Sequence, residues 1–248
     1  MKPLCIDLFC GLGGFSAGFL AEGFACIGFD IERHDYGAGG YPGQLVIQDV
    51  LTIHGSQFRD VAVIVASPPC QEFSYMAMPW SRAKAKAAEY RNGTRDVADL
   101  TRLFDACFRI QREACEAAGR YIPLVVENVK GAQPWVGPAK WHYGSFYLWV
   151  DVPALMPSAR HLKVPGMNFH EHEKTGQPGR SFQSAAVKQA VAGAGETYGG
   201  DFGWDGSAMR TGNSKSPARK AASAQIAMIP FELSRWIART YKPVERVA

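Results

Sequence analysis

Residues 61–74 read VAVIVASPPCQEFS, an apolar run that leads directly into two prolines and a cysteine. Six consecutive apolar residues bounded by turn signals predict a strand buried on both faces, as in a parallel sheet. Pro68 and Pro69 deny regular structure to the residues after them, so Cys70 is predicted on a fixed loop at the carboxyl end of that strand. Ligands bind at this edge in open α/β folds. A free cysteine is more often a buried, inert thiol, but the polar and turn residues around Cys70 disfavour that alternative.

The first 130 residues repeat this alternation of short apolar runs and longer mixed segments, which is typical of βαβ units. The patterns predict strands at 3–9, 24–30, 45–48, 61–66 and 124–127. Helices are predicted at 15–22 and 97–118, ended by Gly23 and Gly119. The fold class predicted is therefore α/β with a parallel sheet.

Residues 7–15, DLFCGLGGF, join a predicted strand to a predicted helix. Glycines there permit a sharp turn and a close ligand, and the helix N-terminus offers free N–H groups to an anion. Ser16 occupies the third glycine position of the dinucleotide fingerprint, so that pattern is imperfect. Asp30, at the end of the second strand, is placed to bind the ribose of a nicotinamide or an adenosyl cofactor. A purely structural turn remains the alternative.

Residues 125–129, VVENV, end another predicted strand with an acid and an amide. If the strands are parallel, Glu127 and Asn128 share the sheet edge with Cys70. Apolar neighbours would raise the pKa of the Glu127 carboxyl, which could then donate a proton. The alternative is a solvated carboxylate at a strand end.

These three motifs, in this order, resemble those of the DNA (cytosine-5)-methyltransferases, of the compact kind found in phages or mobile elements. Gly212-Asn213-Ser214, before a C-terminal helical pattern, is similar to the family's segment that completes the cofactor pocket. The likeness covers most of residues 4–130 and resumes at 212–240. It implies a Rossmann-like, S-adenosylmethionine-dependent methyltransferase sheet with a small, loop-rich recognition insertion.

The resemblance also implies a role for each matching residue. The Cys70 thiolate would add to C6 of a cytosine flipped out of double-stranded DNA, and Glu127 would assist from N3. Asn128 would help to hold the base, while S-adenosylmethionine would supply the methyl group. The residues implied to line the cofactor site are Phe9, Gly11, Gly13, Phe15, Asp30, Asp49 and Asn213.

One family motif is missing. Relatives carry a Q-x-R-x-R-like stretch after E-N-V, whereas residues 141–149, WHYGSFYLW, contain no arginine. Because the carbonyl of a flipped cytosine calls for a charged donor, Arg160 is predicted to replace the missing arginine, with Arg180 the poorer candidate. No metal site is expected, since the histidines at 161, 170 and 172 have no ligand-spaced partner.

The chain divides into three predicted segments: a catalytic and cofactor-binding domain at 1–154, a small target-recognition insertion at 155–211, and a C-terminal helix at 212–248. So small an insertion predicts a short or relaxed recognition site. Residues 74–95 hold five Lys or Arg against one Glu and are predicted to form a mobile basic loop that closes over DNA phosphates. A solvated helix is the alternative there.

The composition agrees with one folded protein of 248 residues, 47% apolar and 20% charged, with a net charge of +4. All six cysteines lie in the first half without a C-x-x-C pair, and the chain shows neither a signal segment nor a membrane-length apolar run, so a cytoplasmic protein is expected. Methyl transfer to RNA, a modified adenosyl donor and a non-catalytic DNA-binding relative stay open. A nicotinamide oxidoreductase would leave Cys70 and Glu127 unexplained.

Overall fold

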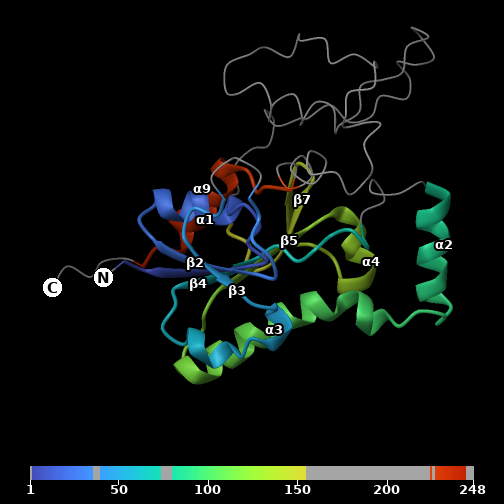
Figure 1. The fold of residues 1–248 in the computed structure, drawn as a ribbon, viewed down its shortest axis with the longest axis horizontal. Helices are drawn as coiled ribbons and strands as arrows, with labels where there is room; N and C mark the ends of the chain where they lie inside the picture. The colour runs from blue at the N-terminus through green and yellow to red at the C-terminus, as the bar shows by residue number, and fades with distance from the viewer. Residues whose placement is uncertain (1, 36–39, 74–79, 155–223, 225–226, 244–248) are drawn as a thin grey trace, which may run out of the picture. The chain divides into compact units, whose positions relative to one another are not determined.

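A seven-stranded sheet forms the centre of the protein in a computed structural model, which describes residues 2–35, 40–73, 80–154, 224 and 227–243 (Figure 1). The strand order is β3-β2-β1-β4-β5-β7-β6. The first five of these strands run parallel, β7 is antiparallel to β5, and β6 is antiparallel to β7. The strands are β1 (Leu4–Leu8), β2 (Ala25–Asp30), β3 (Gln44–Ile47), β4 (Val63–Ala66), β5 (Leu124–Asn128), β6 (Trp141–Tyr143) and β7 (Phe146–Val150).

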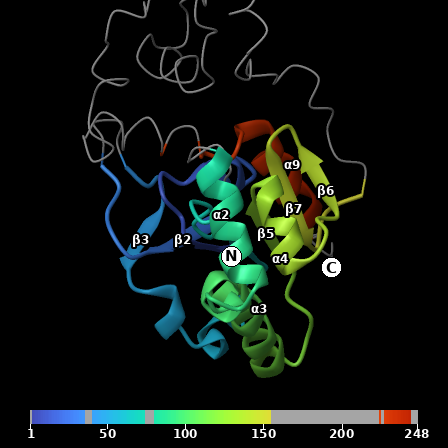
Figure 2. The ribbon, with the colours of Figure 1, turned by 90° about the vertical axis from the view of Figure 1, so that its right-hand side faces the viewer.

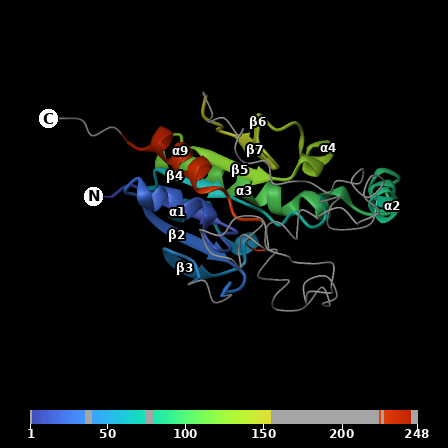
Figure 3. The ribbon, with the colours of Figure 1, turned by 90° about the horizontal axis from the view of Figure 1, so that it is seen from above.

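Helices cover both faces of this sheet, as expected for parallel strands (Figure 3). Helices α1 (Gly14–Ala21) and α9 (Phe231–Tyr241) pack together on one face, and α3 (Val97–Ala118) lies on the other. Asp96 caps α3 by accepting a hydrogen bond from the amide of Ala98 at 2.8 Å, and Gly119 ends it with a φ of +63°. The predicted parallel strands and both predicted helices are therefore confirmed.

The hairpin of β6 and β7 was not predicted from the aromatic, Gly- and Pro-rich sequence after residue 129. Its strands are short, and a two-residue turn joins them, in which Gly144 has a φ of +60°. Short helical turns precede it: η4 (Lys130–Ala132) and α4 (Gln133–Val136).

The chain is built as two compact units. The first comprises residues 1–33, 41–157 and 229–248, and it contains the whole sheet. The second comprises residues 34–40 and 158–228, nearly all of them outside the described ranges. The domain boundaries at 154/155 and 211/212 consequently stay predictions. No helix within the described ranges is long and apolar enough to cross a membrane.

The basic segment after Cys70 contains a helix, α2 (Trp80–Arg91), where the sequence favoured a loop (Figure 2). Lys86 of this helix forms an ion pair with Glu72, and Arg95, just beyond the helix, forms one with Glu89 at 2.7 Å. Residues 80–91 are therefore helical, as in the alternative, and the contact of this segment with DNA phosphates stays a prediction.

The contact between α1 and α9 depends on a glycine. A Cβ built on Gly18 would lie 2.4 Å from both the Ser234 hydroxyl oxygen and the Arg235 amide nitrogen. To make room for a methyl group, the backbone of α9 at Arg235 would have to shift, which costs free energy. Gly18→Ala should therefore lower the unfolding free energy by about 1–3 kcal/mol and Tm by about 2–10 °C. Thermal melts against Ala17→Ser, at a half-buried position of the same helix, would check this. Equal Tm values for the two variants would contradict this prediction.

Candidate active site

The glycine-rich turn after β1 is tied to the end of β2. The amide of Gly11 donates a hydrogen bond of 2.8 Å to one carboxylate oxygen of Asp30, and the amide of Ile31 donates one of 2.8 Å to the other. Phe9 has a φ of +58°, a conformation that non-glycine residues rarely adopt and that is concentrated at functional sites. Gly11, with a φ of +50°, has open space where a Cβ would stand. The turn is thus a preformed cradle with an acid at its rim.

A chain of buried polar groups lies beneath this turn, and sequence reasoning missed it. The Ser16 hydroxyl donates to the carboxylate of Asp7 at 2.7 Å and lies 2.5 Å from the hydroxyl of Tyr41. Burial raises the pKa of Asp7 to about 7. A Cβ on Gly13 would meet Pro42 at 2.4 Å, so the Tyr41-Pro42 segment packs directly against the turn. The only sequence signal was Ser16, which stands at a position where the dinucleotide pattern has glycine.

Cys70 lies on a turn directly after β4, as predicted. The turn is held at both ends, because Asn128 donates from its side-chain amide to the carbonyl of Pro68 at 2.8 Å and the amide of Phe73 donates to the carbonyl of Cys70 at 3.0 Å. The Cys70 thiol is half-buried. Burial and, secondarily, the charge of Glu127 raise its pKa to about 11, so the free protein holds a thiol there at neutral pH.

Glu127 lies beside this turn at the carboxyl end of β5 and is only 8% exposed. The Ser67 hydroxyl donates a hydrogen bond of 3.1 Å to its carboxylate. Burial nevertheless raises the pKa of Glu127 to about 8, and the hydrogen bond from Ser67 only partly opposes that shift. The carboxyl is therefore mostly protonated at neutral pH and able to donate, as its apolar neighbours predicted.

The other predicted site residues lie in different places. Asp49 follows β3 and caps the short helix η1 (Val50–Thr52), accepting from the amide of Leu51 at 2.9 Å. Phe15 is the second residue of α1 and is buried in the core, 2% exposed. Arg160 and Asn213 lie outside the described residues.

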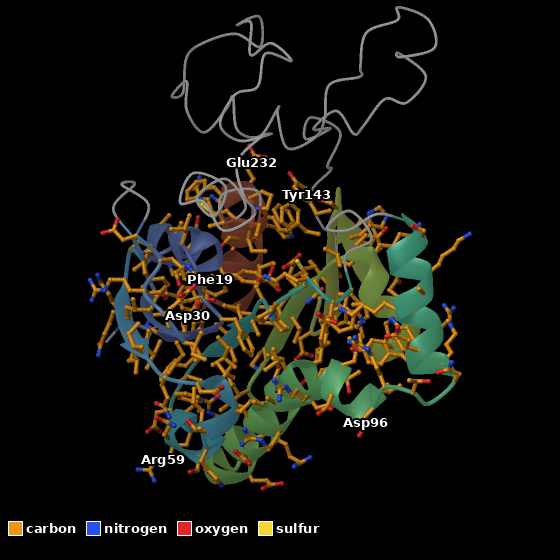
Figure 4. All side chains as sticks on the ribbon, turned by 45° about the vertical axis from the view of Figure 1, so that its right-hand side comes forward. Phe19, Asp30, Arg59, Asp96, Tyr143 and Glu232 are labelled. Carbon is orange, nitrogen blue, oxygen red and sulfur yellow. The ribbon has the colours of Figure 1, made fainter. Side chains whose placement is uncertain are left out.

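The stretch that lacks arginine is the hairpin of β6 and β7. Pairing puts Asn128 opposite Tyr147, and Tyr147 opposite His142, whose rings stack with centroids 5.0 Å apart. Tyr143, buried in the same hairpin, donates to the carboxylate of Glu232 on α9 at 3.4 Å, and the two residues lie at one edge of the fold (Figure 4). The hairpin therefore adds aromatic residues to the edge of the sheet at which Glu127 lies.

Together, the ends of β4 and β5 bring a thiol and a protonated carboxyl to one edge, where the buried amide of Asn128 holds the turn before the thiol, while the ends of β1 and β2 carry the glycine cradle and Asp30. This set can carry out nucleophilic addition assisted by a proton donor, next to a site for a polar cofactor.

Comparison with known proteins gives one family model: residues 4–132 match the C-5 cytosine-specific DNA methylase model. Type II methyltransferase M1.HphI of Haemophilus parahaemolyticus is 39% identical over 84 residues, 30% of this chain and 23% of the relative. Type II methyltransferase M.AplI of Arthrospira platensis is 33% identical over 132 residues, 51% of this chain and 31% of the relative.

The chain thus matches less than a third of the length of these two relatives. Among solved structures, the Entamoeba histolytica methyltransferase EhMeth is 16% identical, with a TM-score of 0.34 over 55% of this chain and 41% of the other.

Proposed function

The chain belongs to the C-5 cytosine-specific DNA methylases, and from that premise we propose that it transfers a methyl group from S-adenosylmethionine to C5 of a cytosine in double-stranded DNA. The observation that carries the proposal is the convergence of two sequence-distant motifs on one edge. Asn128 binds the carbonyl of Pro68, two residues before the thiol, and Glu127 binds Ser67. A module that only bound DNA would need neither a thiol nor a proton donor there.

In the proposed mechanism, the Cys70 thiol gives its proton to a base and the resulting thiolate sulfur bonds to C6 of the flipped base, while N3 receives the proton of Glu127. C5 then holds an electron pair that accepts the methyl group, which S-adenosylmethionine supplies when bound. Loss of the C5 proton to a base leaves the electrons of the C5–H bond to re-form the double bond between C5 and C6. The bond between Cys70 and C6 breaks at the same time, the leaving thiolate takes up a proton, and the proton at N3 goes back to Glu127.

The proton on Glu127 assists this addition in a second way. A charged Glu127 is one of the causes that raise the pKa of Cys70, so protonating the carboxyl removes a negative charge beside the forming thiolate. The same proton thus favours both the nucleophile and the electrophile. Arg160, which would donate to the carbonyl of the base, stays our candidate for the missing arginine.

The cofactor would occupy the cradle at the ends of β1 and β2. Its residues fit an adenosyl group, since the turn leaves space at Gly11 and Asp30 can accept from ribose hydroxyls. Ile31, beside that acid, is 70% exposed, an apolar side chain that a flat ring would cover. We add Ile31 to the proposed site, together with the predicted residues Phe9, Gly13, Phe15, Asp49 and Asn213.

Asp30→Ala should weaken binding of S-adenosylmethionine by about 10- to 100-fold, because it removes charge-assisted hydrogen bonds and releases the turn at Gly11. Equilibrium binding of the cofactor measures this directly. Asp60→Ala, at an exposed position ahead of β4, serves as the control. Equal affinities for the two variants would refute the placement.

The proposed function is tested by incubating the protein with S-adenosylmethionine and duplex DNA, hydrolysing the DNA, and measuring 5-methylcytosine by mass spectrometry. The proposal expects 5-methylcytosine in DNA. The same assay with RNA in place of DNA tests the alternative that the protein methylates RNA. Absence of 5-methylcytosine from every DNA tried would overturn the proposal in favour of a non-catalytic relative.

A further inference from the structure

Glu72, two residues after Cys70, reaches from the nucleophile turn to helix α2. Its carboxylate forms an ion pair with Lys86 and accepts a hydrogen bond from the hydroxyl of Tyr90 at 3.4 Å. Lys86 and Tyr90 are four residues apart, so they lie on one face of the helix and hold the carboxylate between them.

The end of α2 that receives Glu72 is itself fixed to the body of the protein. Tyr90 is 8% exposed, and its ring meets that of Trp135 edge to face with centroids 5.6 Å apart. The guanidinium of Arg91 lies 5.8 Å from the centroid of the Trp135 ring. Trp135 belongs to α4, in the segment that directly follows β5 and Glu127. Helix α2 is therefore anchored to the segment that follows Glu127, the proposed proton donor.

The nucleophile turn has two further attachments, and both of them hold its inner side. Asn128 holds the carbonyl of Pro68 ahead of Cys70, and the ring of Phe73 packs into the core against Phe104 at 5.9 Å. Glu72 extends the other way, with 49% of its side chain exposed. Its contacts with Lys86 and Tyr90 therefore tie the outer side of the turn to α2.

We propose that Glu72 is a positioning residue: through Lys86 and Tyr90 it fixes the nucleophile turn against α2 and so aims the Cys70 thiol. The consequence for catalysis rests on the proposed function, whereas the effect on the thiol itself does not. Aim matters because a shift of about 1 Å in a reacting group can cost up to about 100-fold in rate.

Lys86→Met is the decisive variant, since charge and positioning predict opposite effects on alkylation of Cys70. Removing a cation by itself disfavours a thiolate and slows the reaction with iodoacetamide. Releasing the turn exposes a half-buried thiol whose pKa is raised mainly by burial, which speeds the reaction. We expect the Cys70 alkylation rate at pH 8 to rise about three- to tenfold, measured on its peptide by mass spectrometry.

The same variant should lower the single-turnover rate of methyl transfer to duplex DNA about tenfold while leaving S-adenosylmethionine affinity within about twofold. Glu72→Gln, which keeps an acceptor for Tyr90, should change both rates in the same directions by less. The charge swap Glu72→Lys with Lys86→Glu should restore the alkylation rate toward that of the wild type.

Arg112→Met is the matched control, because it also removes a cation from an ion pair, the exposed one with Glu116 on α3. Alkylation of Lys86→Met at or below the rate of Arg112→Met would overturn the proposal, as would a charge swap that alkylates as fast as Lys86→Met. If the wild type methylates no DNA, the proposed function fails, and the alkylation rates alone still decide the role of Glu72.

Discussion

Replacing Cys70 with serine should abolish methyl transfer, lowering the single-turnover rate by more than about 1,000-fold. A serine hydroxyl is almost never ionised at neutral pH and adds poorly to C6 of a pyrimidine. The two side chains are close in size, and the turn is held by the backbone of Pro68 and Phe73 rather than by the thiol. The variant should therefore fold and bind S-adenosylmethionine as the wild type does.

A covalent trap makes this prediction specific to Cys70. In DNA containing 5-fluorocytosine, fluorine cannot leave C5 as a proton does, so the wild type should stay bonded to the base through Cys70. Cys115→Ser, at the other half-buried cysteine, should trap normally. An active wild type that forms no adduct at Cys70, or a serine variant that keeps its rate, would end the covalent mechanism.

Glu127→Gln should slow the chemical step by about 100- to 10,000-fold, the usual worth of a positioned proton donor. The amide keeps the shape and can still donate a hydrogen bond, but it cannot release a proton to N3. In the wild type, the single-turnover rate should rise with pH up to about 8 and then level off, because each further gain of Cys70 thiolate is offset by loss of the Glu127 proton. In the variant, which has no such carboxyl, the rate should keep rising above pH 8.

The same ionisation gives a stability prediction with a definite sign. The native carboxyl has a pKa of about 8, whereas the ordinary value of 4.5 applies to the unfolded chain. The folded state therefore holds the extra proton between these values, and the unfolding free energy of the wild type falls as pH rises from about 4.5 to 8. Asp7, with a pKa of about 7, adds to the decline but is common to both proteins.

Urea denaturation at pH 5 and pH 9 would measure the difference. The unfolding free energy of Glu127→Gln relative to the wild type should increase by several kcal/mol between these conditions, since a pKa change of one unit is worth about 1.4 kcal/mol. A constant difference between the two proteins would mean that Glu127 is ionised at neutral pH, and its role as a donor would have to be abandoned.

Local patterns were sufficient to predict the core of the fold. Apolar runs long enough for strands, bounded by glycine and proline, located the five parallel strands, and Asp96 and Gly119 bracket α3 where the periodicity begins and ends. Position along the chain then implied that Cys70 and Glu127 share an edge, because parallel strands end together. These inferences need only backbone geometry, which neighbouring residues decide.

Segments whose conformation depends on distant partners were the ones that sequence reasoning missed. Strands β6 and β7 are short and aromatic, and they become strands by pairing with β5. The Lys- and Ala-rich segment 80–91 was predicted as a basic loop with a helix as the alternative, and the structure has the helix, in which Tyr90 packs against Trp135, far along the chain, and Lys86 pairs with Glu72. Such partners carry no local signal.

The sequence by itself determined the α/β architecture, the glycine turn and the order of thiol, acid and amide along one sheet edge. Only the tertiary structure decided how these groups ionise: Glu127 and Asp7 have raised pKa values because segments far along the chain bury them. It also decided that Asp30 holds Gly11 and that Glu72 reaches α2. The physical reason is that backbone conformation is set by adjacent residues, whereas desolvation and ion pairing depend on which groups the folded chain places within a few ångströms.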